Sequence, residues 1–116
     1  MRKNYVLETL LDKGEVSWKP KGNSMAGKIS SGEEVFVKKV PLNALRVGDA
    51  VYAKVKGSYY LHLLSAINEK ENKYLISNNK GRDNGWTSGE NVFGLCLYTE
   101  SRVFVSDTDL EKRISE

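Results

Sequence analysis

The sequence has few of the residues that cross-link small proteins or bind metals. Among its 116 residues there is one cysteine, Cys96, and one histidine, His62. A single cysteine excludes a disulfide within the chain and a metal site made of cysteines alone, and a single histidine excludes a multi-histidine site. We therefore expect no metal and no other cofactor. Any general base at neutral pH must come from few candidates.

Long apolar runs and blocks of one charge are also lacking. No run approaches the roughly 18 to 20 residues that cross a bilayer, and "MRKNYVLETLLDKGE" meets charges too early for a secretory signal. The net charge of +3 arises from 18 Lys and Arg against 15 Asp and Glu, spread along the chain without a basic arm. These features predict a soluble, cytoplasmic protein without a transmembrane segment, and they give no strong signal for nucleic-acid binding.

What the chain does contain is a series of short β-type runs separated by turn residues. In one run Val51, Ala53 and Val55 alternate with larger or charged residues, as in a strand with one buried face. The turn at Lys56-Gly57-Ser58 predicts the tip of a hairpin, and Asn84-Gly85 predicts a further turn. On the strand after it, His62 would share a face with apolar neighbours. The runs are "EVSWKP", "EEVFVKKV", "DAVYAKV", "SYYLHLLSAI", "KYLIS" and "NVFGLCLYTE".

Helices are predicted at the two ends of the chain. The segment "NYVLETLLDKG" has apolar residues at helical spacings and stops at Gly14, and "DTDLEKRISE" predicts a helix capped by Ser106 or Asp107. A chain of this length fits one domain that removes about two-thirds of its unfolded surface from water. We predict a mainly β single domain over residues 1–116, with a β core at 15–99 and short helical ends at 1–14 and 106–116.

A serine in a glycine-containing turn is the first candidate for chemistry. Ser24 lies in "KGNSMAG". A serine hydroxyl is a weak nucleophile, so catalysis needs a neighbouring base and donors that hold the oxyanion formed on attack. The sequence offers His62 and several lysines as bases. Taken alone, the tetrapeptide is more typical of a turn than of a catalytic site.

Five short motifs in a fixed order make a stronger case than the serine alone. The motifs are "KGNSMAGKISSGEEVFVKKV", "LRVGDAVYAKV", "YYLHLL", "KYLISNNKGRDNGWT" and "NVFGLCL". They resemble the clan of serine peptidases that contains the signal peptidases and LexA-like proteins, over about residues 15 to 99. That clan has a G-x-S-M-x-P nucleophile box, a G-D-x-V box, a strand with the general base and a late strand containing glycine. The resemblance implies a coiled, antiparallel β fold of the LexA/signal peptidase type.

The resemblance also implies roles for single residues. Ser24 matches the nucleophile, Met25 matches the apolar residue in the floor of the site, and Asn23 is a candidate oxyanion donor beside the backbone N–H of Ser24. His62 matches the base, which is a lysine in LexA-like and bacterial signal peptidases and a histidine in archaeal and endoplasmic-reticulum signal peptidases. Asp83, the acid of the "SNNKGRDNGW" segment, would orient the imidazole, although its register requires a shift.

Several departures from the family pattern keep a second interpretation open. Gly27 stands where the family has proline, and Gly32-Glu33 stands where it has Gly-Asp. The arginine that follows the family histidine is replaced by Leu63. The leading hypothesis is a serine endopeptidase, similar to a signal peptidase, that acts on a peptide or protein substrate. The alternative is a catalytically degenerate protein-binding or regulatory module, and nucleic-acid binding is a weaker third hypothesis.

Single residues also have structural interpretations. His62 could be a partly buried histidine with one hydrogen bond, and Lys54 could replace it as the base, although its position in the alternating strand predicts a solvent-facing side chain. Cys96 lies in an apolar run and is more typical of a small core residue than of a nucleophile. Trp18 and Trp86 fit the core or rim of a β fold better than a stacking platform for nucleic acid. The sequence does not predict the substrate or the oligomeric state.

Overall fold

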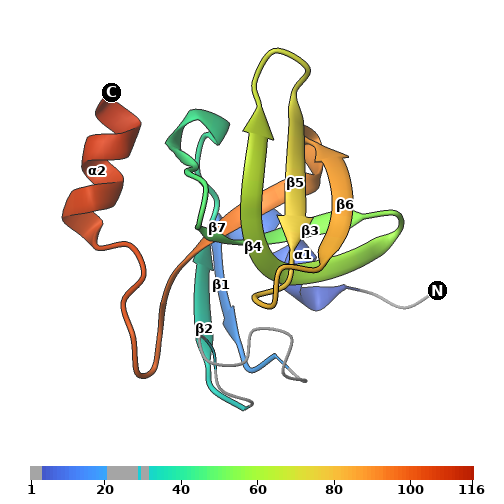
Figure 1. Ribbon diagram of the computed structural model, residues 1–116. Helices are drawn as coiled ribbons and strands as arrows, with labels where there is room; N and C mark the ends of the chain where they lie inside the picture. The colour runs from blue at the N-terminus through green and yellow to red at the C-terminus, as the bar shows by residue number, and fades with distance from the viewer. Residues whose placement is uncertain (1–3, 21–28, 30–31) are drawn as a thin grey trace.

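The fold is a single curled antiparallel sheet with a helix at each end of the chain (Figure 1). The computed structural model describes residues 4–20, 29 and 32–116. The elements are α1 (Tyr5–Lys13), β1 (Glu15–Trp18), β2 (Val35–Lys38), η1 (Leu42–Ala44), β3 (Ala50–Val55), β4 (Ser58–Asn68), β5 (Lys73–Ser77), β6 (Asp83–Ser88), η2 (Gly89–Asn91), β7 (Val92–Thr99) and α2 (Asp107–Ser115), where η is a 3-10 helix.

The strands form one sheet in the order β1-β2-β7-β3-β4-β5-β6, and every pairing is antiparallel. The sheet curls so that β6 returns to β3, where the Thr87 hydroxyl donates a hydrogen bond to the carbonyl oxygen of Lys54 at 2.8 Å. Register shifts in four of the pairings supply bulges, which bend strands and increase their twist. The prediction of a mainly β, coiled antiparallel fold is confirmed.

Alternation along the strands divides the apolar residues between the two faces of the sheet. One cluster fills the inside of the curl and includes Val51, Leu64 and Ile76, each with no exposed surface. The second cluster lies on the other face, where Leu10 of α1 covers Val37 and its neighbours. Because side chains of a strand point alternately to its two faces, β4 contributes Leu64 to the first cluster and Leu63 to the second.

Capping residues set the helix boundaries that the sequence predicts. The Asn4 side chain accepts a hydrogen bond from the backbone N–H of Leu7 at 3.0 Å, and Gly14 ends α1 in the left-handed conformation with φ 79°. Ser106 caps α2 in the same way by accepting from the N–H of Asp109. Both terminal helices are therefore confirmed. None of the helices in the described part of the chain is long and apolar enough to span a bilayer.

The segment around Asn84-Gly85 differs from its prediction. The sequence indicated a turn, whereas the structure has strand β6 with a register shift opposite Ile76 and Ser77. Gly85 adopts φ 136°, and a Cβ at this position would lie 3.3 Å from Cγ1 of Val55 and 3.3 Å from Cε of Lys56. Glycine therefore permits both the backbone conformation and the close approach of β6 to β3. The residues that looked like a turn form a bulge.

Cys96 lies inside the second cluster and has no exposed surface. Burial raises the pKa of its thiol to about 12, and the negative charge of Glu33 adds to this effect, while hydrogen bonds with the backbone at Phe36 and Tyr98 oppose it. A thiol that stays protonated is a poor nucleophile. Cys96 is a core residue in this fold.

We expect the stability of the protein to fall with pH because of this thiol. An acidic group whose pKa is raised on folding binds its proton more tightly in the native state, so stability is full below the unfolded pKa of about 8.5 and is lost above it. Between pH 8 and pH 10 the loss should be about 2 kcal/mol. Urea unfolding of wild type and Cys96→Ala at both pH values measures it. An equal decline in both proteins would contradict the assignment to Cys96.

Candidate functional site

His62 lies in the middle of β4 and points to the inside of the curl. The residue is buried, with 5% of its surface exposed. The ring of Tyr60, on the same face of the strand, lies 4.9 Å away between centroids at an angle of 32°. Across the curl, His62 Nδ1 lies 2.5 Å from Oδ1 of Asn84 in β6. The imidazole is therefore held by two strands that the fold brings together.

The contact with Asn84 favours one tautomer of the neutral ring. An amide oxygen only accepts hydrogen bonds, so Nδ1 carries the hydrogen and Nε2 keeps the lone pair in the neutral ring. This is the tautomer in which Nε2 can take a proton from a hydroxyl group. Sequence reasoning missed Asn84. The sequence did contain a signal for it, because Asn84 directly follows the candidate acid in "GRDNGW". An amide oxygen, like a carboxylate oxygen, can accept the hydrogen of an imidazole.

Asp83 accepts a hydrogen bond from Ser77, whereas the contact with the imidazole is made by Asn84. The Ser77 hydroxyl donates to Asp83 Oδ1 at 2.6 Å, and the Ser65 and Ser77 hydroxyl oxygens lie 2.6 Å apart. Ser77 is buried, whereas Asp83 and Ser65 are exposed. Since β4, β5 and β6 each contribute one residue, this chain of hydrogen bonds ties the three strands together where their registers shift. Asp83 thus stabilises the part of β6 that carries Asn84.

The candidate nucleophile Ser24 and its neighbours Asn23 and Met25 lie outside the described residues. Two described residues that follow them in the sequence, Ile29 and Glu33, contact the rest of the fold. Ile29 is 5% exposed and belongs to the second apolar cluster. A carboxylate oxygen of Glu33 accepts hydrogen bonds from the Thr99 hydroxyl at 2.5 Å, from the Ser101 N–H at 2.8 Å and from the Ser101 hydroxyl. Glu33, which replaces the family aspartate, is therefore bound to the end of β7.

Lys54 does not share a face with His62. Its ammonium group lies 5.4 Å from the centroid of the Tyr59 ring, on the outer side of the β3–β4 hairpin. His62 pairs instead with Val51, a residue of the inner cluster. In the described part of the chain, His, Cys, Asp and Glu side chains form no group of three or more that could hold a metal ion.

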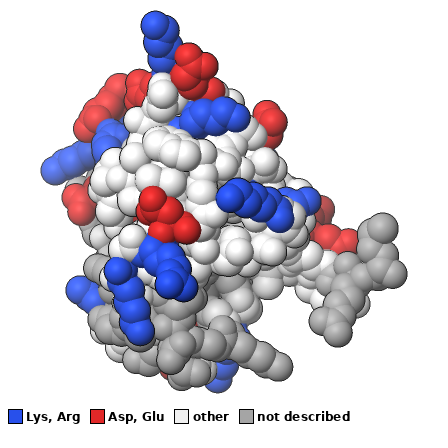
Figure 2. Space-filling model, turned by 45° about the vertical axis from the view of Figure 1, so that its right-hand side comes forward, with Lys and Arg blue, Asp and Glu red and all other residues white. Residues whose placement is uncertain are grey.

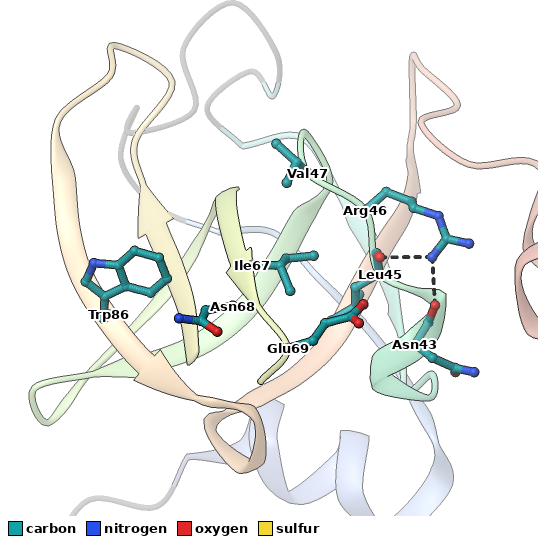
Figure 3. A pocket seen from close by; sticks show the side chains of 8 residues that line it. All are labelled: Asn43, Leu45, Arg46, Val47, Ile67, Asn68, Glu69 and Trp86. Carbon is teal, nitrogen blue, oxygen red and sulfur yellow. Dashed lines mark hydrogen bonds between the residues drawn. The ribbon is translucent and has the colours of Figure 1, made fainter. Parts of the chain in front are cut away.

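A groove of about 870 Å³ opens between the loop before β3 and the strands β4 and β6 (Figure 3). Trp86, two residues after Asn84, is 50% exposed and forms one side of the groove, and Ile67 of β4 lies opposite it. Arg46 is fixed at the other end because its guanidinium donates to the carbonyl oxygens of Asn43 and Leu45 at 2.7 and 3.0 Å. The lining combines apolar side chains with amides and charges of both signs.

Charges of both signs are mixed on the visible surface. In Figure 2 Lys and Arg side chains alternate with Asp and Glu side chains over most of the described part of this face, and a few Lys and Arg side chains lie together at its lower left. A nucleic-acid site would require cations gathered along one groove or stripe. The face shown in Figure 2 does not have this arrangement among its described residues.

Comparison with protein-family models gives a match over most of the chain. The family model is described as Peptidase S24-like and matches residues 7–88, which include the motif around Ser24 and the strands β3, β4 and β6. No curated protein matches the chain, and no solved structure matches it.

Proposed function

Because the chain belongs to the peptidase S24-like family, we propose that it is a serine peptidase that hydrolyses a peptide bond with Ser24 and His62. The observation that supports this most directly is the hydrogen bond between His62 Nδ1 and Asn84 Oδ1. It gives the ring the tautomer that a serine peptidase needs and fixes its orientation. The proposed substrate is a peptide or protein.

In the proposed reaction, Ser24 Oγ attacks the peptide carbonyl carbon while His62 Nε2 takes the hydroxyl proton. The carbonyl oxygen becomes an oxyanion, to which the backbone N–H of Ser24 and the Asn23 side chain donate hydrogen bonds. His62 then gives the proton to the leaving amine as the C–N bond breaks. Water, deprotonated by His62, hydrolyses the acyl-enzyme and frees Ser24. Met25 would contribute apolar surface to the floor of the site.

Asn84 takes the orienting role in this proposal, and Asp83 supports it. Asn84 touches the ring, while Asp83 binds Ser77 and holds the neighbouring backbone of β6. An amide leaves the imidazolium without the opposite charge that a carboxylate supplies. The orienting effect remains, because the direction of the ring depends on the acceptor at Nδ1.

Single substitutions of Asn84 and Asp83 distinguish the roles of these two neighbours. We expect Asn84→Ala to lower kcat by about 10²-fold, since a small misplacement of a catalytic group has an effect of this size. Asp83→Ala should lower kcat much less, and Asn84→Asp should retain most of the activity. Steady-state kinetics of the three variants, with ¹⁵N spectra of the His62 ring, measure the difference. A larger loss in Asp83→Ala than in Asn84→Ala would return the orienting role to Asp83.

A second candidate function is a binding or regulatory module without turnover. The low exposure of His62, 5%, favours it, because a histidine with one hydrogen bond and little exposed surface can be a purely structural residue. The two candidates share a fold and differ in whether Nε2 reaches the serine and the substrate.

Comparison of wild type with Ser24→Ala tests the proposal. Both proteins are incubated with a mixed peptide library, and products are identified by mass spectrometry. The peptidase hypothesis expects cleavage at defined bonds by the wild type and none above the buffer blank by the variant. Equal, negligible cleavage by both proteins would favour the binding module. Equal, substantial cleavage would point to a contaminating peptidase and would remove the support for Ser24.

A further inference from the structure

Two ion pairs link the C-terminal helix α2 and its cap residue Glu116 to the turn that precedes β3. Arg113 Nη1 lies 2.8 Å from Asp49 Oδ2 and also donates to the carbonyl oxygen of Ala44 at 3.2 Å. In the second pair the turn supplies the cation, and Arg46 Nη2 lies 2.7 Å from Glu116 Oε2 at the end of the helix. Helix α2 stands beside the sheet and is joined to β7 by a segment that turns away from it and returns (Figure 1). It lies outside residues 7–88 that the family model matches.

The two ion pairs differ in their burial. The side chains of Arg46 and Glu116 are 40% and 67% exposed, so their attraction is largely screened by water. The side chain of Asp49 is 7% exposed and that of Arg113 is 20% exposed. Removing the cation from a buried carboxylate strongly destabilises the folded protein. Asp49 Oδ2 also accepts the backbone N–H of Arg46 at 2.7 Å, so the carboxylate joins the turn and the helix through one oxygen.

Asp49 connects this network to the strand of His62. The carbonyl oxygen of Asp49 accepts the N–H of Leu64 at 2.8 Å, and the N–H of Gly48 donates to the carbonyl oxygen of Leu64 at 2.8 Å. Leu64 lies two residues after His62, on the same inner face. Leu110 of α2 belongs to the same apolar cluster as Leu64. A buried ion pair therefore links the helix to the turn before β3, and Leu110 adds the helix to the apolar cluster that contains Leu64.

We propose that Arg113 is a positioning residue, through which docking of α2 holds the turn before β3 against Leu64 of β4 and keeps His62 in its orientation toward Asn84. Its importance for turnover rests on the proposed peptidase function, whereas its effect on the ring does not. Without the guanidinium, Asp49 is drawn toward water, the two hydrogen bonds of Leu64 open more often, and the ring of His62 loses its fixed direction.

The test compares Arg113→Met, which keeps the apolar stem and removes the charge, with Arg113→Lys and with Lys112→Met. Lys112 is exposed on the same helix, so its variant is a control for charge alone. We expect the amides of Gly48 and Leu64 to exchange hydrogen at least about ten-fold faster in Arg113→Met. The ring signals of His62 should shift or broaden, and kcat should fall while KM stays constant. Arg113→Lys should recover part of each effect, and Lys112→Met should match the wild type.

The charge-neutral variant Asp49→Asn/Arg113→Met separates positioning from the effect of an unpaired carboxylate. It removes both charges and keeps an acceptor for the N–H of Arg46. Fast hydrogen exchange at Leu64 and altered His62 ring signals in this variant support positioning by α2. This result decides the question even if Arg113→Met alone does not fold. Wild-type exchange and ring signals in the double variant would overturn the proposal. If wild type cleaves no peptide, the peptidase function fails, and the exchange and ring signals still decide the role of Arg113.

Discussion

His62→Gln is expected to lower kcat/KM for peptide cleavage by about 10²- to 10⁴-fold, the range that a positioned general base contributes. Glutamine can keep the contact with Asn84, because its side-chain amide can donate a hydrogen bond to the same oxygen. It cannot take a proton from Ser24. The loss should therefore appear in the chemical step, with kcat falling more than KM changes.

The control for this prediction is Tyr59→Phe. Tyr59 lies on the same strand, is 38% exposed, and points to the opposite face from His62. Its variant should keep the wild-type kcat/KM. Near-ultraviolet circular dichroism and the unfolding midpoint establish that both variants fold. If folded His62→Gln cleaves peptides as fast as the wild type, another group acts as the base, and the mechanism proposed for His62 is wrong.

The sheet could be predicted from the sequence because its signals are local. Alternation in residues 50–55, the turn at Gly57, the helix stop at Gly14 and the cap at Ser106 each act over a few residues, and each of these elements appears where its pattern placed it. Strand β6 was missed for the same reason. Asn84-Gly85 is locally a turn signal, and only the approach of β6 to β3 across the curl turns it into a bulged strand.

The partners of the candidate site depend on contacts that the sequence does not encode locally. The family resemblance placed His62 as the base, and its location inside the curl follows from the alternation of β4. Which residue meets its ring depends on the register shift between β5 and β6, because one residue of slip moves a side chain to the other face. That shift brings Asn84, rather than the adjacent Asp83, to the imidazole. Arg113 was missed because its partner lies 64 positions earlier in the chain.

The inner face of β4 also predicts the largest change in stability. Leu64 has no exposed surface and packs in the cluster with Ile76 and Val51. Leu64→Ala removes apolar atoms from this cluster and leaves a cavity that the surrounding strands can only partly close. The free energy of unfolding should fall by about 3 to 5 kcal/mol. Urea unfolding, followed by circular dichroism, measures the change, and the m-value should stay constant if the native and unfolded states keep their compactness.

Leu11→Ala is the matched control for Leu64→Ala, because it deletes the same atoms from a leucine that is 52% exposed on α1. Its effect should stay within about 0.5 kcal/mol, since alanine favours the helix and little burial is lost. A similar loss in both variants would mean that the inside of the curl is not the main core. A large loss in Leu64→Ala alone has a second consequence. Leu64 bonds to the turn at Asp49 and lies two residues from His62, so the strand that carries the proposed base also carries a fully buried residue of the core.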